Sequence, residues 1–130
     1  MRIRSLDHLV LTVSDIPATV RFYESLGMRR EVFGDGRVAL HFGDQKLNLH
    51  EAGEEIAPHA AEPTPGSADL CFLVADGLDE IAKELSRTGI AVELGPVART
   101  GATSALTSLY VRDPDGNLIE LSQTVNRITE

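Results

Sequence analysis

The sequence is poor in several residue types, and each shortage argues against a class of protein. The 130 residues include no tryptophan, and only 5% are aromatic, which disfavours a broad stacking surface for flat ligands. The single cysteine, Cys71, rules out an internal disulfide framework and a zinc cluster of paired cysteines. No apolar run approaches the ~20 residues that a membrane-spanning helix needs. With 12 basic against 20 acidic residues, the formal charge of −8 disfavours nucleic acid and anionic membrane surfaces as partners.

The remaining composition is typical of one soluble globular domain. Hydrophobic residues make up 42% and charged residues 25% of the chain, both ordinary values for such a domain. The N-terminal stretch MRIRSLDHLV has neither the apolar core nor the cleavage site of a signal peptide. We therefore expect a cytoplasmic protein.

Two similar halves are visible along the chain, and each is predicted to form one strand, one helix and three further strands. In the first half we expect a strand at Leu6–Val13, a helix from the cap Asp15 to Gly27, and strands at Arg29–Phe33, Arg37–Phe42 and Gln45–His50. In the second half we expect a strand at Asp69–Val74, a helix from the cap Asp76 to Gly89, and strands at Ala91–Leu94, Ala105–Val111 and Asn117–Ser122.

Constant spacings support this repeat. Three positions recur after 61 residues, so that His8, Val13 and Asp15 correspond to Asp69, Val74 and Asp76. In the last strands, Leu47 and Leu49 correspond to Ile119 and Leu121 after 72 residues. The Pro- and Ala-rich segment 51–66 is predicted to link the halves, or to fold over a site as a lid. We expect a single domain over residues 1–130, with module one at about 3–50 and module two at about 67–123.

Alternation along the strands separates an apolar face from a polar one. The first and last strands of each half place only aliphatic and aromatic residues on one face, where the helices are expected to pack. The opposite face carries a small set of polar residues, namely His8, Asn48, His50, Asp69 and Glu120. The predicted fold class is α+β, with a mixed sheet whose open face becomes a ligand pocket if the sheet is curved.

Imidazole and carboxylate groups together suit a divalent transition metal. His8, His50 and Glu120 would form a set of two histidines and one carboxylate, which favours ferrous iron and also accommodates manganese, nickel, cobalt or zinc. Asp69 is a fourth ligand, an orienting partner of a histidine, or a general base. Glu120 is the predicted catalytic residue, because a metal and burial tune carboxylate basicity.

Three further residues are candidates for substrate binding. Asn48 shares the polar face, and His41 lies on a neighbouring strand where it either lines the pocket or is exposed. Arg99, in the stretch VARTGATS that we predict to be a loop, either binds a substrate anion or is a solvated charge. No phosphate loop, nucleophile elbow or dinucleotide fingerprint is present.

Three stretches, LDHLVLTVSDIPATVRFYESLGM, FGDQKLNLHE and YVRDPDGNLIELS, resemble the vicinal oxygen chelate superfamily. This superfamily contains glyoxalase I, bleomycin-resistance proteins, fosfomycin-resistance transferases and extradiol dioxygenases. The stretches NLHE, PTPGSADLCF and GPVARTGA resemble its glyoxalase-domain virulence-protein subgroup. The resemblance implies paired β-α-β-β-β modules forming a cup around a divalent metal, and a homodimer.

Carried over by position, the ligands that the resemblance implies are His8, Asn48, Asp69 and Glu120. Asn48 stands where glyoxalase I has a glutamate and Asp69 where many members have histidine, so methylglyoxal isomerisation is in doubt. The leading hypothesis is a metal-dependent lyase, isomerase or dioxygenase with a small oxygen-chelating substrate. The alternatives are a metal-free drug- or metabolite-binding protein of the bleomycin-resistance type, and an interaction module with a vestigial cup.

Overall fold

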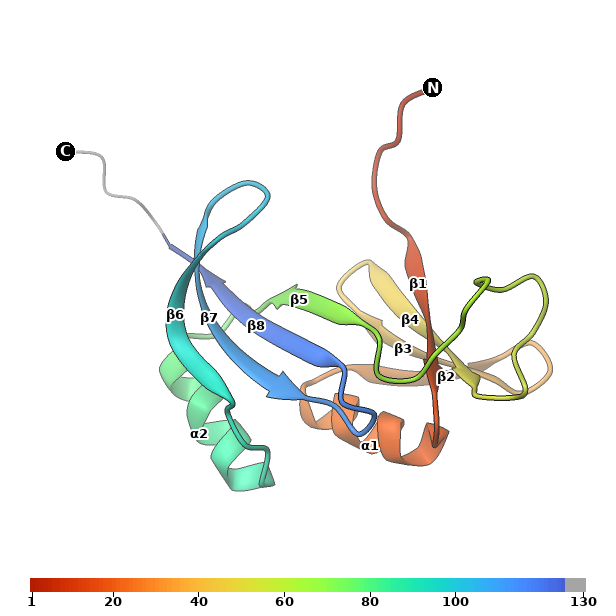
Figure 1. Ribbon diagram of the computed structural model, residues 1–130. Helices are drawn as coiled ribbons and strands as arrows, with labels where there is room; N and C mark the ends of the chain where they lie inside the picture. The colour runs from red at the N-terminus through yellow and green to blue at the C-terminus, as the bar shows by residue number, and fades with distance from the viewer. Residues whose placement is uncertain (126–130) are drawn as a thin grey trace. The chain divides into compact units, whose positions relative to one another are not determined.

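The computed structural model describes residues 1–125, and the chain within it divides into two compact units. Unit 1 comprises residues 1–68 and 113–116, and unit 2 comprises residues 69–112 and 117–125. Each unit contains one four-stranded sheet and one helix (Figure 1). Neither helix in residues 1–125 has the length and apolar character needed to cross a membrane.

The sheet of unit 1 has the strand order β1-β4-β3-β2. Its elements are β1 (His8–Val13), α1 (Ile16–Ser25), β2 (Arg29–Phe33), β3 (Arg37–Phe42) and β4 (Gln45–Glu51). β1 runs parallel to β4, and the other neighbouring strands are antiparallel. The helix packs against β2, β3 and β4, so it covers the face that carries Leu40, Leu47 and Leu49, all nearly inaccessible to solvent.

Unit 2 repeats this arrangement with the strand order β5-β8-β7-β6. Its elements are β5 (Asp69–Leu73), α2 (Leu78–Thr88), β6 (Leu94–Thr100), β7 (Ala105–Arg112) and β8 (Leu118–Thr124). β5 is parallel to β8, and the remaining pairs are antiparallel. Leu109, Val111, Ile119 and Leu121 form the buried side of the sheet. The predicted α+β fold of two β-α-β-β-β modules is thereby confirmed.

The helix starts show one correct prediction and one error. Asp15 caps α1, because its side chain accepts a hydrogen bond from the Ala18 N–H at 3.1 Å. The predicted cap Asp76 is wrong, since Gly77 occupies the cap position of α2 without a side-chain bond. Asp79 and Glu80 in the first turn of α2 provide the negative charge that a helix N-terminus favours. Gly89 ends α2 in the left-handed conformation, with φ of 77°.

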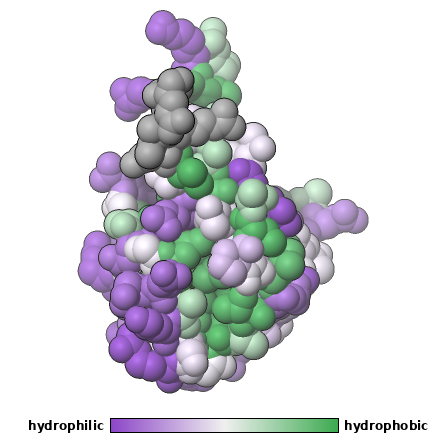
Figure 2. Space-filling view, turned by 90° about the vertical axis from the view of Figure 1, so that its left-hand side faces the viewer, coloured by the Kyte–Doolittle hydropathy of each residue, from purple (hydrophilic) through white to green (hydrophobic). Residues whose placement is uncertain are grey.

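The largest error concerns the strand expected at Ala91–Leu94, because the strand is β6, which begins at Leu94 and extends to Thr100. Gly95 and Pro96 within it resemble a turn signal in the sequence. They are tolerated because β6 is the edge strand of its sheet and its pairing with β7 is irregular between Leu94 and Val97. Leu94, at the start of β6, is 47% exposed. Figure 2 views the side on which α2 and β6 lie in Figure 1, and it shows hydrophobic and hydrophilic surface side by side.

Candidate functional site

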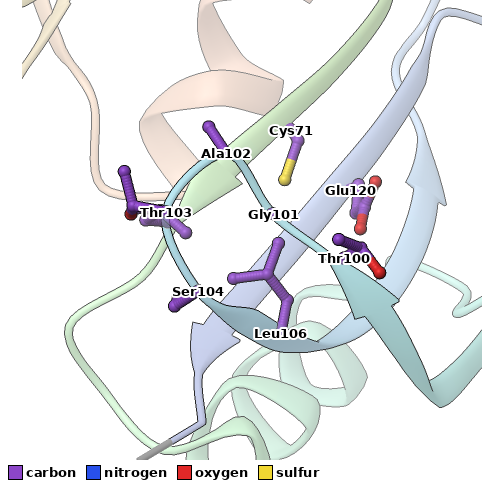
Figure 3. Close-up of a pocket in the computed structure, with 9 residues that line it drawn as sticks. Cys71, Thr100, Gly101, Ala102, Thr103, Ser104, Leu106 and Glu120 are labelled. Carbon is purple, nitrogen blue, oxygen red and sulfur yellow. The ribbon is translucent and has the colours of Figure 1, made fainter.

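The open face of unit 2 contains a hollow of about 380 Å³ beside Glu120 (Figure 3). Glu120 on β8 lies opposite Cys71 on β5 in the strand register, so both side chains project from the same face. The loop 101–104 forms the opposite wall, and Leu73 and Leu106 add apolar surface. Cys71 is exposed and lines this hollow, so it is not a core residue. A half-buried carboxylate at the edge of a mixed polar and apolar hollow is a typical ligand-site arrangement.

Two buried serines hold the Glu120 carboxylate. The Ser108 hydroxyl on β7 donates to Oε2 of Glu120 at 2.6 Å, and the Ser122 hydroxyl lies 3.3 Å from the same oxygen. Both serines are 0% exposed. Both serine contacts are made to Oε2, and Cys71 also interacts with this carboxylate. The carboxylate is therefore held mainly through Oε2, at the edge of the hollow.

Arg99 lies on β6 and not in a loop, which corrects the sequence-based expectation of its setting. Its Nε donates to the hydroxyl of Tyr110 at 2.8 Å, and its guanidinium carbon lies 5.3 Å from the centre of that ring. Tyr110 is opposite Glu120 across the β7–β8 pair. Arg99 thus joins the open face of unit 2, held over Tyr110 by a hydrogen bond and a cation–π contact.

The sequence-based reasoning missed Ser108 and Tyr110. Both lie on β7 at alternate positions, on the face that Glu120 occupies on β8. The predicted strand Ala105–Val111 already implied this alternation. Only the antiparallel register, however, determines which β7 residues lie beside Glu120.

Asp69 is the remaining predicted residue in unit 2. It opens β5 and is exposed, opposite Leu118 in the register. The parallel pairing places it two residues before the level of Glu120, or roughly 7 Å along the strands at about 3.3 Å per residue. Asp69 and Glu120 therefore share a face, two residue steps apart along the strands.

In unit 1, His8 is two residue steps, or roughly 7 Å along the strands, from the level of Asn48 and four steps from the level of His50. Asn48 lies opposite Val10 and His50 opposite Thr12 in the β1–β4 register. His50 is thus four residue steps of about 3.3 Å, or roughly 13 Å, from the level of His8. His8 is half exposed, and its Nδ1 lies 2.9 Å from Oδ1 of Asp7.

Asn48 and His50 carry buried polar atoms without partners. Their exposed fractions are 5% and 4%. Oδ1 of Asn48 and both ring nitrogens of His50 lack hydrogen-bond partners in the described chain. An unpaired buried polar group costs about 1–3 kcal/mol of stability, so these atoms indicate a ligand or a site kept at the expense of stability.

His50 also borders a second hollow, of about 340 Å³, in unit 1. Thr12 of β1 and the segment 58–63, including His59, line it with His50. Burial lowers the pKa of His50, the positive charges of Arg37 and His59 lower it further, and Glu55 opposes them. The imidazole is therefore neutral near pH 7 and presents one donor and one acceptor.

His41 is engaged elsewhere. Its Nε2 lies 3.0 Å from Oε1 of Glu31 on the neighbouring strand β2. The hydrogen bond to His41 lowers the pKa of the Glu31 carboxyl, so the two groups form an ion pair when the histidine is protonated. His41 is half-buried on the open face of the sheet and does not line the hollow beside His50.

We expect replacement of His50 by phenylalanine to raise stability by about 1–3 kcal/mol, because it removes two unpaired buried nitrogens. The variant should also lose the part of the pH dependence of its stability that His50 causes. The lowered pKa means that the unfolded chain binds the proton more readily, so the wild-type protein loses stability as the pH falls through about 6.5. Urea unfolding at several pH values between 5 and 8 measures both effects.

The matched control is His41→Phe, which removes a histidine that has a partner and should not gain stability. A His50→Phe protein less stable than the wild type at pH 7 would show that the ring nitrogens of His50 have partners in solution.

Within either unit, no three histidine, cysteine, aspartate or glutamate side chains among residues 1–125 gather closely enough to hold a metal ion. The predicted ligands are distributed between the units, with His8 and His50 in unit 1 and Asp69 and Glu120 in unit 2. Their chemistry nevertheless suits a divalent ion, since they offer imidazole nitrogen and carboxylate oxygen. Asn48 adds a buried amide oxygen that has no partner among the described residues.

The family model for the Glyoxalase/Bleomycin resistance protein/Dioxygenase superfamily matches residues 5–121. The chain therefore belongs to this superfamily, as its sequence resemblance predicted. Members share the paired-module fold described above but differ in chemistry, so membership does not by itself identify a reaction.

Similar proteins confirm the predicted subgroup. Virulence protein STM3117 of Salmonella typhimurium is 54% identical over 96% of this chain and 88% of its own length. Its crystal structure has a TM-score of 0.94 with this chain and is covered over 100% of its length. Glyoxalase domain-containing protein RDO1 of Mycosarcoma maydis is 54% identical over 94% of this chain and 69% of its own.

A more distant solved structure, TnmS3, is an antibiotic-binding protein from a Streptomyces species. It is 25% identical, covers 96% of this chain and 99% of its own, and has a TM-score of 0.73. A lactoylglutathione lyase from Agrobacterium tumefaciens shares the fold, with a TM-score of 0.71. It is 23% identical, and the match covers 94% of this chain and 95% of the lyase.

Proposed function

We propose that this protein is a divalent-metal-dependent enzyme of the glyoxalase type that acts on a small substrate with chelating oxygen atoms. The observation that carries the proposal is the Glu120 carboxylate. Its Oε2 accepts a hydrogen bond of 2.6 Å from Ser108, and the half-buried carboxylate lines a hollow of about 380 Å³. A carboxylate in this setting serves both as a metal ligand and as a group that takes and returns a proton.

We propose His8, Asn48, Asp69 and Glu120 as the ligands. Asn48 replaces His50 in this set, because the β1–β4 register places Asn48 nearer to the level of His8. The unpaired Oδ1 of Asn48 supports this choice. When bound, a divalent ion such as iron, manganese, nickel, cobalt or zinc supplies Lewis-acid polarisation of substrate oxygens.

The other polar residues of the two open faces are assigned to substrate binding. Arg99 is held by Tyr110 through Nε and by the Ala98 carbonyl through Nη1, at 2.8 and 3.0 Å. Its remaining terminal nitrogen is available for an anionic group of the substrate. His50 is proposed to contact substrate from unit 1, where the hollow beside it provides apolar walls. His41 is proposed to contact substrate from the open face of β3, outside this hollow.

The test is metal binding by the full chain purified without chelator, followed by titration with each of the five ions in a calorimeter. Glu120→Gln should weaken binding by more than the roughly 10–100-fold that loss of an outer partner costs. Glu93→Gln is the control, because that carboxylate is exposed and paired with Arg112 at 3.0 Å. A wild-type protein that binds none of the ions, or a Glu120→Gln protein that binds them normally, would refute the proposal.

A metal-free binding protein is the second candidate. It is supported by the lack, within either unit of the described chain, of three clustered metal-binding side chains. The likeness to the antibiotic-binding protein TnmS3 also supports it. Ligand binding that is unaffected by a chelator, without turnover, would favour this function.

A homodimer is also proposed. The N-terminal segment ahead of β1 exposes Ile3 by 88% and Leu6 by 61%, and apolar side chains exposed together often mark a protein interface. Light scattering coupled to size exclusion measures the mass, and a monomer at micromolar concentration would contradict this assignment.

A further inference from the structure

Basic side chains gather on the open face of the unit 1 sheet. The strand register places one residue from each strand in a single row across the sheet, namely His8, Lys46, His41 and Arg29. Residues paired in this way project from the same face. Arg37 lies on that face as well, four residues before His41 on β3. The formal charge of the whole chain is −8, so this face is opposite in sign to the protein that carries it.

The strands supply little negative charge to balance this face. Among the described strand residues that share it, Glu31 is the only carboxylate, and it is paired with His41 at 3.0 Å. The hydrogen bond with His41 lowers the pKa of the Glu31 carboxyl most, and the positive charges of Arg29 and Lys46 lower it further. This single carboxylate therefore stays ionised, but it cannot balance the charges of Arg29, Arg37 and Lys46.

Two of the cations, Arg37 and Lys46, converge on the ring of Phe33. The guanidinium carbon of Arg37 lies 5.0 Å from the ring centre, and Nζ of Lys46 lies 4.1 Å from it. Both side chains are half-buried, and neither forms an ion pair with any residue in the described part of the chain. Like charges held this close repel each other, and the face of the ring offsets the repulsion only in part. An anion would be attracted by both.

A further group without a partner lies beside Arg37. The His50 side chain is on the same face, is 4% exposed, and has no partner for either ring nitrogen in the described chain. Arg37 and His50 together line a hollow of about 180 Å³. Asp35, Glu51 and Glu54 also border this hollow, but Arg37 pairs with none of them. A neutral imidazole has one N–H that it can donate to an anion.

We infer that the open face of unit 1 binds a small oxyanion, a carboxylate or phosphate group, chiefly through Arg37 and Lys46. Since this step rests on the proposed function, the oxyanion belongs to the substrate, which is then negatively charged. The planar guanidinium of Arg37 can hold two oxygens of such a group, and the ammonium of Lys46 adds a point charge. A small ligand fits better than a nucleic acid, because the acidic chain as a whole would repel a long polyanion.

The test is calorimetric titration of the full chain with inorganic phosphate and, separately, with malonate. The protein is first stripped of metal on a chelating resin, and the ionic strength is held constant. Lys46→Met and Arg37→Met should each weaken binding of the preferred anion by roughly tenfold, the low end for a hydrogen bond to a charged group. Arg30→Met is the matched control, because alternation along β2 places Arg30 on the opposite face.

Two further variants separate charge from packing. Lys46→Arg keeps the positive charge and should retain binding. Glu31→Gln removes the carboxylate of this face, so it should strengthen anion binding by about 2–5-fold, a gain that partial unfolding cannot produce. Glu24→Gln makes the same change of charge on α1, which packs against the other face of the sheet, and should have little effect.

The outcomes distinguish this inference from the proposed function. Unchanged affinity in both Lys46→Met and Arg37→Met, or a Lys46→Arg protein as weak as Lys46→Met, would overturn the inference. A wild-type protein that binds neither anion at millimolar concentration would overturn it too, and normal metal binding would then leave the proposed function intact. Anion binding that depends on Arg37 and Lys46, in a protein that takes up no metal, would support the inference and refute metal dependence alone.

Discussion

Replacing Gly95 with alanine is expected to destabilise the protein by about 3–5 kcal/mol, the sum of backbone strain and overpacking. Gly95 has φ of +116°, a conformation that residues with a side chain rarely adopt. A Cβ at this position would lie 2.4 Å from the carbonyl oxygen of Ser108 and 3.0 Å from Cα of Leu109. Neither backbone atom can move away without displacing β7. Urea or thermal unfolding measures the loss.

The same substitution should also disturb the carboxylate site, since Ser108 is the residue whose hydroxyl holds Glu120. Gly43→Ala is the control for backbone strain alone, because Gly43 also has positive φ but nothing within 4 Å of an added Cβ. We expect it to cost about 1–2 kcal/mol. If the two variants lose equal stability, the close approach of Gly95 to β7 is not present in solution.

Replacing Tyr23 with phenylalanine is expected to cost about 1.5–3 kcal/mol, the range for a hydrogen bond to a charged group. Tyr23 is 0% exposed in α1, and its hydroxyl donates to Oδ2 of Asp113 at 2.7 Å. Burial raises the pKa of Tyr23 well above its ordinary value, and the charge of Asp113 raises it further, so the hydroxyl remains a donor. The substitution removes one hydrogen-bond donor from the Asp113 carboxylate, a residue that is only 5% exposed.

Tyr110→Phe serves as the control, because it also removes a tyrosine hydroxyl, in this case the one that contacts Arg99. The Tyr110 hydroxyl accepts from Arg99, whose side chain is exposed, so its loss should cost about 1 kcal/mol or less. Equal losses in chemical denaturation would mean that burial of the Tyr23–Asp113 pair adds nothing to stability.

Much of the fold was predictable because local signals agreed with one another. Positions of strands β2 and β3 match the predicted ranges, and the caps at Asp15 and Gly89 have simple chemical causes. The prediction of β6 failed because strand pairing overrode the local sequence signal. Gly95 and Pro96 indicate a turn, yet they lie in an edge strand whose partner tolerates the irregularity.

The candidate site was predictable only in outline. Alternation and the 61- and 72-residue spacings selected the polar face and its residues. They gave no account of Ser108 or Tyr110, which are ordinary strand residues in sequence. The same patterns could not rank Asn48 against His50, because the offset between β1 and β4 depends on how these strands pair.

The sequence by itself determined the order of elements, the repeat, the apolar face of each sheet and the family, because these depend on residue type and spacing along the chain. Only the tertiary structure decided which side chains are neighbours across strands. Hydrogen bonds between strands set that register, and a shift of one residue would turn Glu120 away from Ser108. Strand pairing and packing therefore produce both the hydrogen bond from Ser108 to Glu120 and the burial of the His50 ring, whose nitrogens have no partner in the described chain.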